Sequence, residues 1–160
     1  MQALAPERYS LLTTISRESQ ERIQRARELL SHELPNAEVA EIIDRALIAL
    51  VEKLERRKFA ATPAPRRSRS EPQSGKRYIP AEVKREVTRR DNGQCTFVSE
   101  DGHRCDSRMF LEFDHIQEFA RGGVATVEGL RLRCRAHNQY TAALTYGRDF
   151  MQEKRPRAPA

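Results

Sequence analysis

Four residues able to bind a soft metal ion restrict the fold of this chain more than any other feature of its sequence. Cys95 and Cys105 lie close together, and Cys134 and His137 follow in a C-x-x-H spacing. The chain has three cysteines, and an odd number cannot be paired fully in disulfides, which favours a reducing compartment and a metal site. Three thiolates and one imidazole form a common tetrahedral zinc site, so we expect a structural Zn²⁺ here.

Two alternatives to this ligand set remain open in the sequence. The first pair is wider than the usual C-x-x-C, so a hairpin has to bring the thiolates of Cys95 and Cys105 together. His103 lies between them and could replace one of them, although cysteine is the stronger thiolate ligand and completes the set without it. Three scattered, buried thiols that bind no metal are the second alternative.

The segments between and after these ligands predict a strand, a loop, a second strand and a helix. "FLEFDHI" (residues 110–116) alternates apolar and polar residues and ends at Asp114 and His115. "LRLRC" (residues 130–134) alternates as a second strand would, and a helix is predicted to begin near Asn138. This order of elements places Asp114, His115 and Asn138 around one point.

The composite motif "RRDNGQC … C … FDHI … GG … EGLRLRCRAHN" resembles the HNH endonuclease family over about Arg77 to Met151. The resemblance implies a ββα-metal core in which the three cysteines and the histidine above form a zinc knuckle. It also implies that His115 is the general base that deprotonates a water attacking phosphorus. Asp114 and Asn138 would then be ligands of one catalytic divalent cation.

The residue types agree with these implied roles. A neutral imidazole, with an ordinary pKa of about 6.5, accepts a proton at cellular pH. Carboxylate and amide oxygens suit Mg²⁺ or Mn²⁺, whereas thiolates suit zinc. The ligand types therefore distinguish the expected zinc site from the expected site of the catalytic cation. We therefore expect a metal-dependent endonuclease that hydrolyses phosphodiester bonds in DNA. The alternatives are a zinc-stabilised DNA-binding protein with a decayed nuclease site and an interaction protein whose helices bind another protein.

The chain departs from the HNH pattern at Gly129, where the family has an asparagine that braces the loop and helps to orient the base. Glycine supplies backbone freedom but no amide side chain. A loosely held imidazole would cost about one to three orders of magnitude in rate. The sequence therefore predicts that Gly129→Asn raises cleavage without changing DNA binding.

Basic residues give the chain a net charge of +6 and favour a polyanionic partner such as DNA. The excess lies in residues 61–80, with five Lys and Arg against one Glu, and in the last nine residues, with three against one. Basic DNA-searching arms and solubilising segments both agree with this distribution. A helix is also predicted to follow Pro80, with Val83 and Val87 facing inward and basic residues outward. The candidate phosphate contacts, for which a solvated surface is the alternative, are Lys84, Arg85, Arg89, Arg121, Arg131, Arg133 and Arg135.

The first 59 residues predict a helical module for dimerisation or DNA targeting. A strand is expected over Tyr9–Ile15, followed by a helix capped by Ser16 and a second helix capped by Asn36. The second helix carries a long apolar stripe from Val39 to Leu54, which favours a homodimer formed through residues 9–57. The order of elements also resembles ribbon-helix-helix DNA-binding modules, and a plain helical hairpin is the alternative.

These patterns together predict an α+β protein with four regions. The helical module (1–59) is followed by a disordered basic linker (60–76), an HNH-like domain (77–151) and a basic tail (152–160). No stretch has the composition of a signal peptide or the length of a membrane span, so we expect a cytoplasmic protein without a membrane partner.

Overall fold

The computed structural model describes residues 2–6, 8–36, 38–65 and 78–153. Its contacts divide the chain into two compact units, Met1–Lys53 and Leu54–Ala160, so the boundary falls within helix α2 (Val39–Phe59) and not at residue 59. Helices and short antiparallel sheets are both present, in agreement with the α+β class. Residues 66–76 of the predicted linker and 154–160 of the tail lie outside the described part. None of the described helices is both long and apolar enough to cross a membrane.

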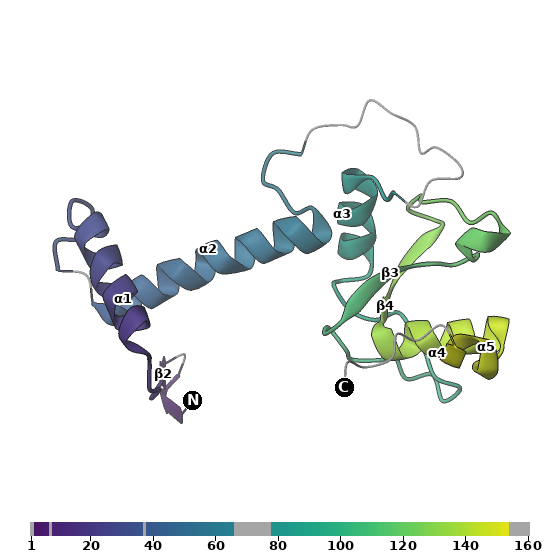
Figure 1. Cartoon of the computed structure of the whole chain (residues 1–160), viewed down its shortest axis with the longest axis horizontal. Coiled ribbons are helices and arrows are strands. Elements are labelled where there is room, and N and C mark those ends of the chain that lie inside the picture. Colours follow the sequence, from purple (N-terminus) through teal and green to yellow (C-terminus); the bar gives the residue numbers. More distant parts are fainter. Residues whose placement is uncertain (1, 7, 37, 66–77, 154–160) are drawn as a thin grey trace. The chain divides into compact units, whose positions relative to one another are not determined.

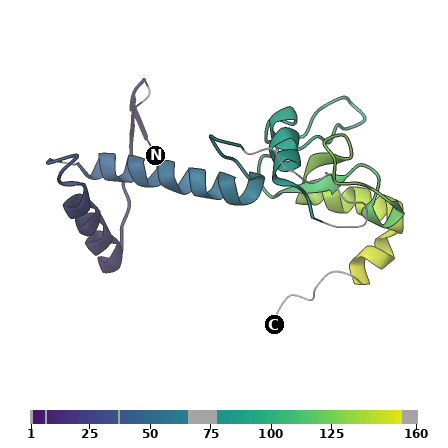
Figure 2. The ribbon, with the colours of Figure 1, turned by 90° about the horizontal axis from the view of Figure 1, so that it is seen from above.

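The first unit consists of a β-hairpin and two helices. Strands β1 (Gln2–Ala5) and β2 (Arg8–Ser10) pair antiparallel, and α1 (Arg17–Leu30) precedes α2, which Figure 2 shows as a long, straight helix. The predicted cap of α1 is confirmed, because the Ser16 hydroxyl accepts a hydrogen bond from the Ser19 amide at 3.2 Å.

Two sequence predictions for this unit are wrong in their bounds. The strand expected over Tyr9–Ile15 is limited to Arg8–Ser10, because the four-residue β1 is its pairing partner and offers no further ladder. Asn36 does not cap α2. The carbonyl of Glu38 accepts the first helical hydrogen bonds, so the helix begins later than the sequence suggests.

The second unit places a two-stranded sheet between helices (Figure 1). Strands β3 (Leu111–His115) and β4 (Leu130–Cys134) pair antiparallel, which confirms both predicted strands. Helix α3 (Ala81–Arg90) packs on β4 through Val83 and Val87, which are buried as predicted against Leu130 and Leu132. The short 3-10 helix η1 (Phe119–Arg121) lies in the connection between the strands.

Helix α4 (Arg135–Tyr146) packs against both strands and is followed by α5 (Arg148–Glu153). The sequence predicted one helix from about residue 138, whereas α4 begins immediately after β4 at Arg135. Gly147 has a φ of 90°, which is not helical, so α4 ends there. The chain bends between α4 and α5 (Figure 2). Because α4 starts directly at the end of a strand, its first turn is fixed relative to the sheet.

An apolar face of α2 has no cover among the described residues of the first unit. Ile43, Leu47, Leu50 and Leu54 recur at helical spacing, and the three leucines are each about half exposed. Ile42 is the one buried residue that this unit contains in its described part. A segment with so small a core offsets little of the entropy cost of its own ordering, which is why a partner for this face is expected.

The charges of α2 favour a second copy in antiparallel orientation. Acidic residues predominate around its first half (Glu38, Glu41 and Asp44, against Arg45), and basic residues predominate in its second half (Lys53, Arg56, Arg57 and Lys58, against Glu52 and Glu55). Two antiparallel copies would place each acidic half beside a basic half, whereas parallel copies would place like charges together.

We predict that the full chain forms a homodimer in which Leu47 is buried, and that Leu47→Glu converts it to a monomer. The matched control is Ile48→Glu. Ile48 is as exposed as its neighbour, at 54% against 53%, but lies about 100° around the helix from the apolar face. Sedimentation velocity at micromolar concentrations measures the association state of each protein. A monomeric wild type, or equal dissociation by both variants, would exclude pairing through this face.

Candidate metal centre and adjoining polar pocket

A hairpin-like loop after α3 brings Cys95 and Cys105 together, as the sequence required. The amide of Cys95 donates to the carbonyl of Ser107 at 2.9 Å, and the amide of Cys105 donates to the carbonyl of Phe97 at 2.8 Å. An isolated antiparallel bridge between Val98 and Arg104 lies nearer the tip of the loop. These backbone bonds fold the chain back on itself, so the wide spacing of the first ligand pair does not separate the two thiols.

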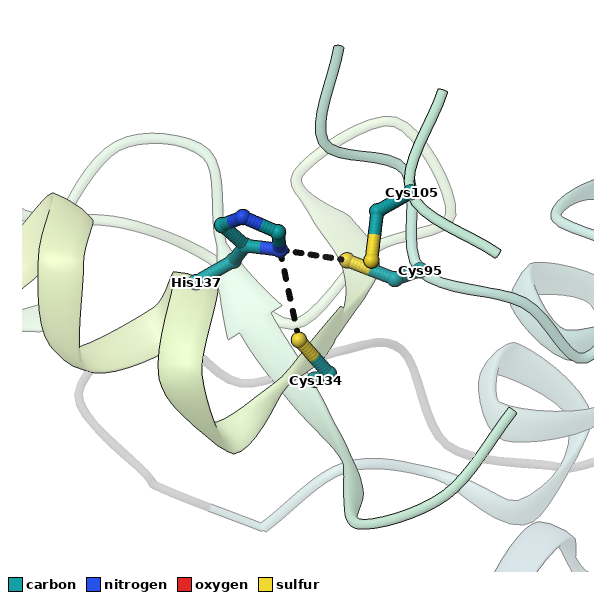
Figure 3. A group of neighbouring side chains, drawn as sticks. All are labelled: Cys95, Cys105, Cys134 and His137. Carbon is teal, nitrogen blue, oxygen red and sulfur yellow. Dashed lines mark hydrogen bonds between the residues drawn. The ribbon is translucent and has the colours of Figure 1, made fainter. Parts of the chain in front are cut away.

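The end of β4 and the first turn of α4 contribute the other two ligands. Cys134 is the last residue of β4, and His137 lies one helical turn further along the chain. The Nδ1 atom of His137 is 3.3 Å from the sulfur of Cys134 and 3.6 Å from that of Cys95 (Figure 3). One ligand atom from each of the four residues lies within 4.8 Å of all the others, and the side chains point toward one another (Figure 3).

The environment of His137 favours its neutral, metal-binding form. Burial lowers the pKa of His137, and the positive charge of Arg133 lowers it further. The ring of Phe97 stacks on the imidazole with 3.9 Å between centroids and 9° between planes, which fixes the ring orientation. A neutral imidazole held in one orientation is the form that coordinates a metal ion.

The thiols influence one another strongly at this distance. Burial raises the pKa of the Cys95 thiol, but hydrogen bonds from the backbone of Cys134 and Phe97 outweigh this effect and lower it overall. The pKa of Cys105 is raised, because burial and the nearby charge of Cys95 exceed the effect of its hydrogen bond from the Ser107 backbone. Several adjacent thiolates repel one another without a cation between them. The donor set therefore fits a tetrahedral zinc ion, which these four residues could bind.

His103 is not part of this cluster. Its side chain is exposed in the loop, and its carbonyl accepts a hydrogen bond from the Ser99 amide at 2.9 Å. The structure therefore groups the ligands as the sequence favoured and leaves His103 outside the site.

A pocket of about 260 Å³ lies beside the end of β3 and against α4. All three residues that the sequence placed around one point line this pocket, namely Asp114, His115 and Asn138. The Nε2 atom of His115 is buried and has no hydrogen-bond partner within the described part of the chain. A buried polar atom without a partner is costly, so this nitrogen is suited to an external donor or acceptor.

The other two predicted residues are held by neighbouring side chains. The Nε atom of Arg131 donates to Oδ2 of Asp114 at 2.8 Å, across the strand pair. The Nδ2 atom of Asn138 donates to a carboxylate oxygen of Glu112 at 2.7 Å. Both polar groups are therefore oriented before anything binds in the pocket.

The pocket also contains an acid that the sequence analysis missed. Glu118 precedes η1 and accepts a hydrogen bond from the Thr145 hydroxyl at 2.9 Å. Its backbone and Thr145 lower the pKa of the Glu118 carboxyl. The sequence motif does not identify Glu118, because this residue reaches the pocket only through the fold of the loop after β3 and its hydrogen bond to Thr145 of α4.

Several of the expected phosphate contacts have structural partners instead. Arg131 pairs with Asp114, and Arg135, which is the first residue of α4, pairs with Glu112 at 3.1 Å. Arg133 is 9% exposed, so the expectation that it contacts phosphate is not met by this conformation. The remaining candidates are half-buried or exposed, and they are Lys84, Arg85, Arg89 and Arg121.

Gly129 is required by a close approach of two backbone segments, which corrects its interpretation from sequence. A Cβ atom at this position would lie 2.4 Å from the Val124 carbonyl oxygen. The Gly129 amide donates to the Thr126 hydroxyl at 3.0 Å, and its carbonyl accepts from the Ile116 amide at 2.9 Å. The loop beside His115 is therefore already braced by the backbone, and the expectation that an asparagine restores a missing brace is wrong.

No family model matches the chain, and neither does any curated protein or solved structure.

We predict about one zinc ion per chain, lost in His137→Ala and retained in His103→Ala. Both variants remove one imidazole, but only His137 lies in the ligand cluster. Because metal binding contributes folding energy at such sites, chelation should unfold residues 77–151 and spare the first helices. Elemental analysis of freshly purified protein measures zinc, and circular dichroism follows unfolding. Protein without zinc, or zinc unchanged in His137→Ala, would contradict this ligand assignment.

We predict that Gly129→Asn destabilises the second unit by about 1–3 kcal/mol, since the added Cβ forces two backbone segments apart. The control is Gly102→Asn. A Cβ at Gly102 meets nothing within 4 Å, so this variant carries only the strain of its positive φ of 80°, which asparagine tolerates better than most residues, and Gly129→Asn should cost more. Denaturant unfolding of the zinc-loaded proteins compares the two. Equal stability of Gly129→Asn and wild type would show that the loop accepts a side chain.

Proposed function

We propose that residues 77–151 form an HNH-type, metal-dependent endonuclease domain that hydrolyses phosphodiester bonds in DNA. The observation that supports this most directly is that His115 lines one pocket with Asp114 and Asn138, while its buried Nε2 has no hydrogen-bond partner among the described residues. The order of elements agrees with this function, because Asp114 and His115 at the end of β3 and Asn138 in the first turns of α4 line the same pocket.

His115 acts as the general base in this proposal. Its Nε2 accepts a proton from a water molecule as the oxygen of that water attacks phosphorus. The ring packs edge-on against Phe119 with 5.7 Å between centroids, which limits its rotation. A base held in one orientation saves the cost of positioning it in each turnover.

Asp114 and Asn138 would hold one hard cation such as Mg²⁺ or Mn²⁺. Arg131 binds Oδ2 of Asp114 and Glu112 binds Nδ2 of Asn138, so the remaining oxygen of each side chain is the one that a cation would use. A bound divalent ion would supply positive charge that stabilises the phosphate and the leaving oxygen. Arg131 and Glu112 thereby serve as positioning residues for the two ligands.

Contacts to the DNA backbone are assigned to the basic residues that remain accessible. Arg121 is exposed in η1, whose Phe119 lines the pocket, and it has Glu118 as a loose partner at 3.9 Å. Arg89 is exposed on α3 and pairs with Glu86, from which a phosphate group can compete for it. Such contacts position DNA without reading its sequence.

We predict that His115→Ala lowers the rate of plasmid nicking by about 10²–10⁴-fold, since general-base terms have this size. DNA binding should be unchanged, because the imidazole contributes to the chemical step and not to contacts with phosphate. His103→Ala is the matched control, as it removes an exposed imidazole outside the pocket. Single-turnover nicking of supercoiled plasmid is measured in Mg²⁺, in Mn²⁺ and in EDTA.

Three outcomes separate this function from its alternatives. Metal-dependent cleavage that His115→Ala abolishes supports the endonuclease. Salt-sensitive DNA binding without cleavage in any metal supports a zinc-stabilised DNA-binding protein whose nuclease site has decayed. Absence of both activities in folded, zinc-loaded protein supports an interaction protein instead.

A further inference from the structure

Arg133 is a buried cation with no carboxylate partner in the described residues. Its side chain is 9% exposed, and its Nε and Nη1 atoms are buried without hydrogen-bond acceptors. Other arginines of the same unit are well satisfied: Arg90 donates to two backbone carbonyls and to Asp91, and Arg104 donates to three backbone carbonyls. An unpaired buried charge is costly, so Arg133 requires a compensating negative charge.

The sheet supplies this charge only in part, through the attraction of Asp114. Arg133 lies opposite Glu112 in the β3–β4 ladder, and a cross-strand pair would be the ordinary solution. The carboxylate of Glu112 is instead bound to Arg135 and Asn138. The next acid along β3, Asp114, is bound to Arg131 at 2.8 Å.

The sulfur cluster supplies negative charge near the guanidinium. The charge of Cys95 attracts Arg133 and counts among the interactions that raise its pKa, against the larger lowering effect of burial. The guanidinium carbon is 5.1 Å from the centroid of Phe97, whose ring stacks on His137. Arg133 therefore lies close to two of the candidate metal ligands. The charge of Cys95 acts on it directly, and the Phe97 ring lies between it and His137.

We propose that Arg133 is the counter-charge of the metal centre, held beside the thiolates to neutralise the zinc complex. Three thiolates and one neutral imidazole leave a Zn²⁺ site with one net negative charge. One guanidinium brings the buried assembly to neutrality, which removes the cost of burying either charge alone. The role concerns zinc retention and is independent of whether the neighbouring pocket cleaves DNA.

The test measures zinc affinity by competition with a chromophoric chelator. Arg133→Met keeps a long apolar side chain but removes the charge, and should weaken binding by about tenfold to a hundredfold, as the loss of an outer-sphere partner does. Arg133→Lys keeps the charge and should recover part of the affinity. Cobalt substitution reports the same site independently, because thiolate-to-cobalt absorption shows whether the ligand set is complete.

Arg135→Met is the matched control. Arg135 also adjoins Cys134 and lies over a phenylalanine ring, that of Phe110 at 5.7 Å, but it is exposed and paired with Glu112. This variant should bind zinc as the wild type does. A wild-type affinity in Arg133→Met would overturn the proposal. If Arg133→Met fails to fold in excess zinc, the zinc affinity of Arg133→Lys decides the question. A near-normal affinity supports the role of the positive charge. Failure of Arg133→Lys to fold would overturn the proposal, because the charge alone would then not be sufficient.

Discussion

The metal centre and the hydrophobic core of the second unit are one structure. Cys95 and Cys134 belong to the same buried cluster as Val87, Leu130 and Leu132, so their sulfur atoms fill space that larger apolar side chains would fill in a bigger domain. A core of this size buries too little apolar surface to hold a fold by itself. Bonds from one ion to four residues of the loop, the strand and the helix would replace the missing apolar contacts, and every other feature of the unit depends on that junction.

Buried polar groups supply the rest of the cohesion around this small core. Asp91, at the end of α3, is 5% exposed and accepts hydrogen bonds from Arg90 and from the backbone amide of Leu132 in β4. Arg104 binds the carbonyl of Asp91 from the metal-binding loop. Helix, strand and loop are thus joined through one carboxylate residue and two guanidinium groups. Arginines can therefore be structural in this unit, and net charge by itself is a poor guide to a DNA-binding surface.

The sequence predicted those features that depend on local pattern or ligand chemistry. The alternation of residues 110–116 and 130–134 identified both strands, Ser16 identified a helix start, and the ligand types identified the four clustered residues that could bind a metal. The sequence did not predict features that depend on contacts between residues distant in the chain. Gly129 was interpreted as a lost side chain, although the Val124 carbonyl excludes any side chain there. Arg133 was assigned to phosphate because strand periodicity cannot show that Glu112 binds Arg135 and Asn138 instead.

The metal centre and the polar pocket are linked through consecutive residues of α4. His137 faces the thiol cluster and Asn138 lines the pocket, because adjacent residues of a helix point about 100° apart. Cys134 ends the strand from which α4 starts, so a bound ion would fix both the position and the rotation of the first helical turn. Asp114 and His115 are placed by the partner strand β3, whose register with β4 is set by five residue pairs. An ion at the thiol cluster would therefore determine how Asn138 meets Asp114 and His115, although it would lie outside the pocket that they line.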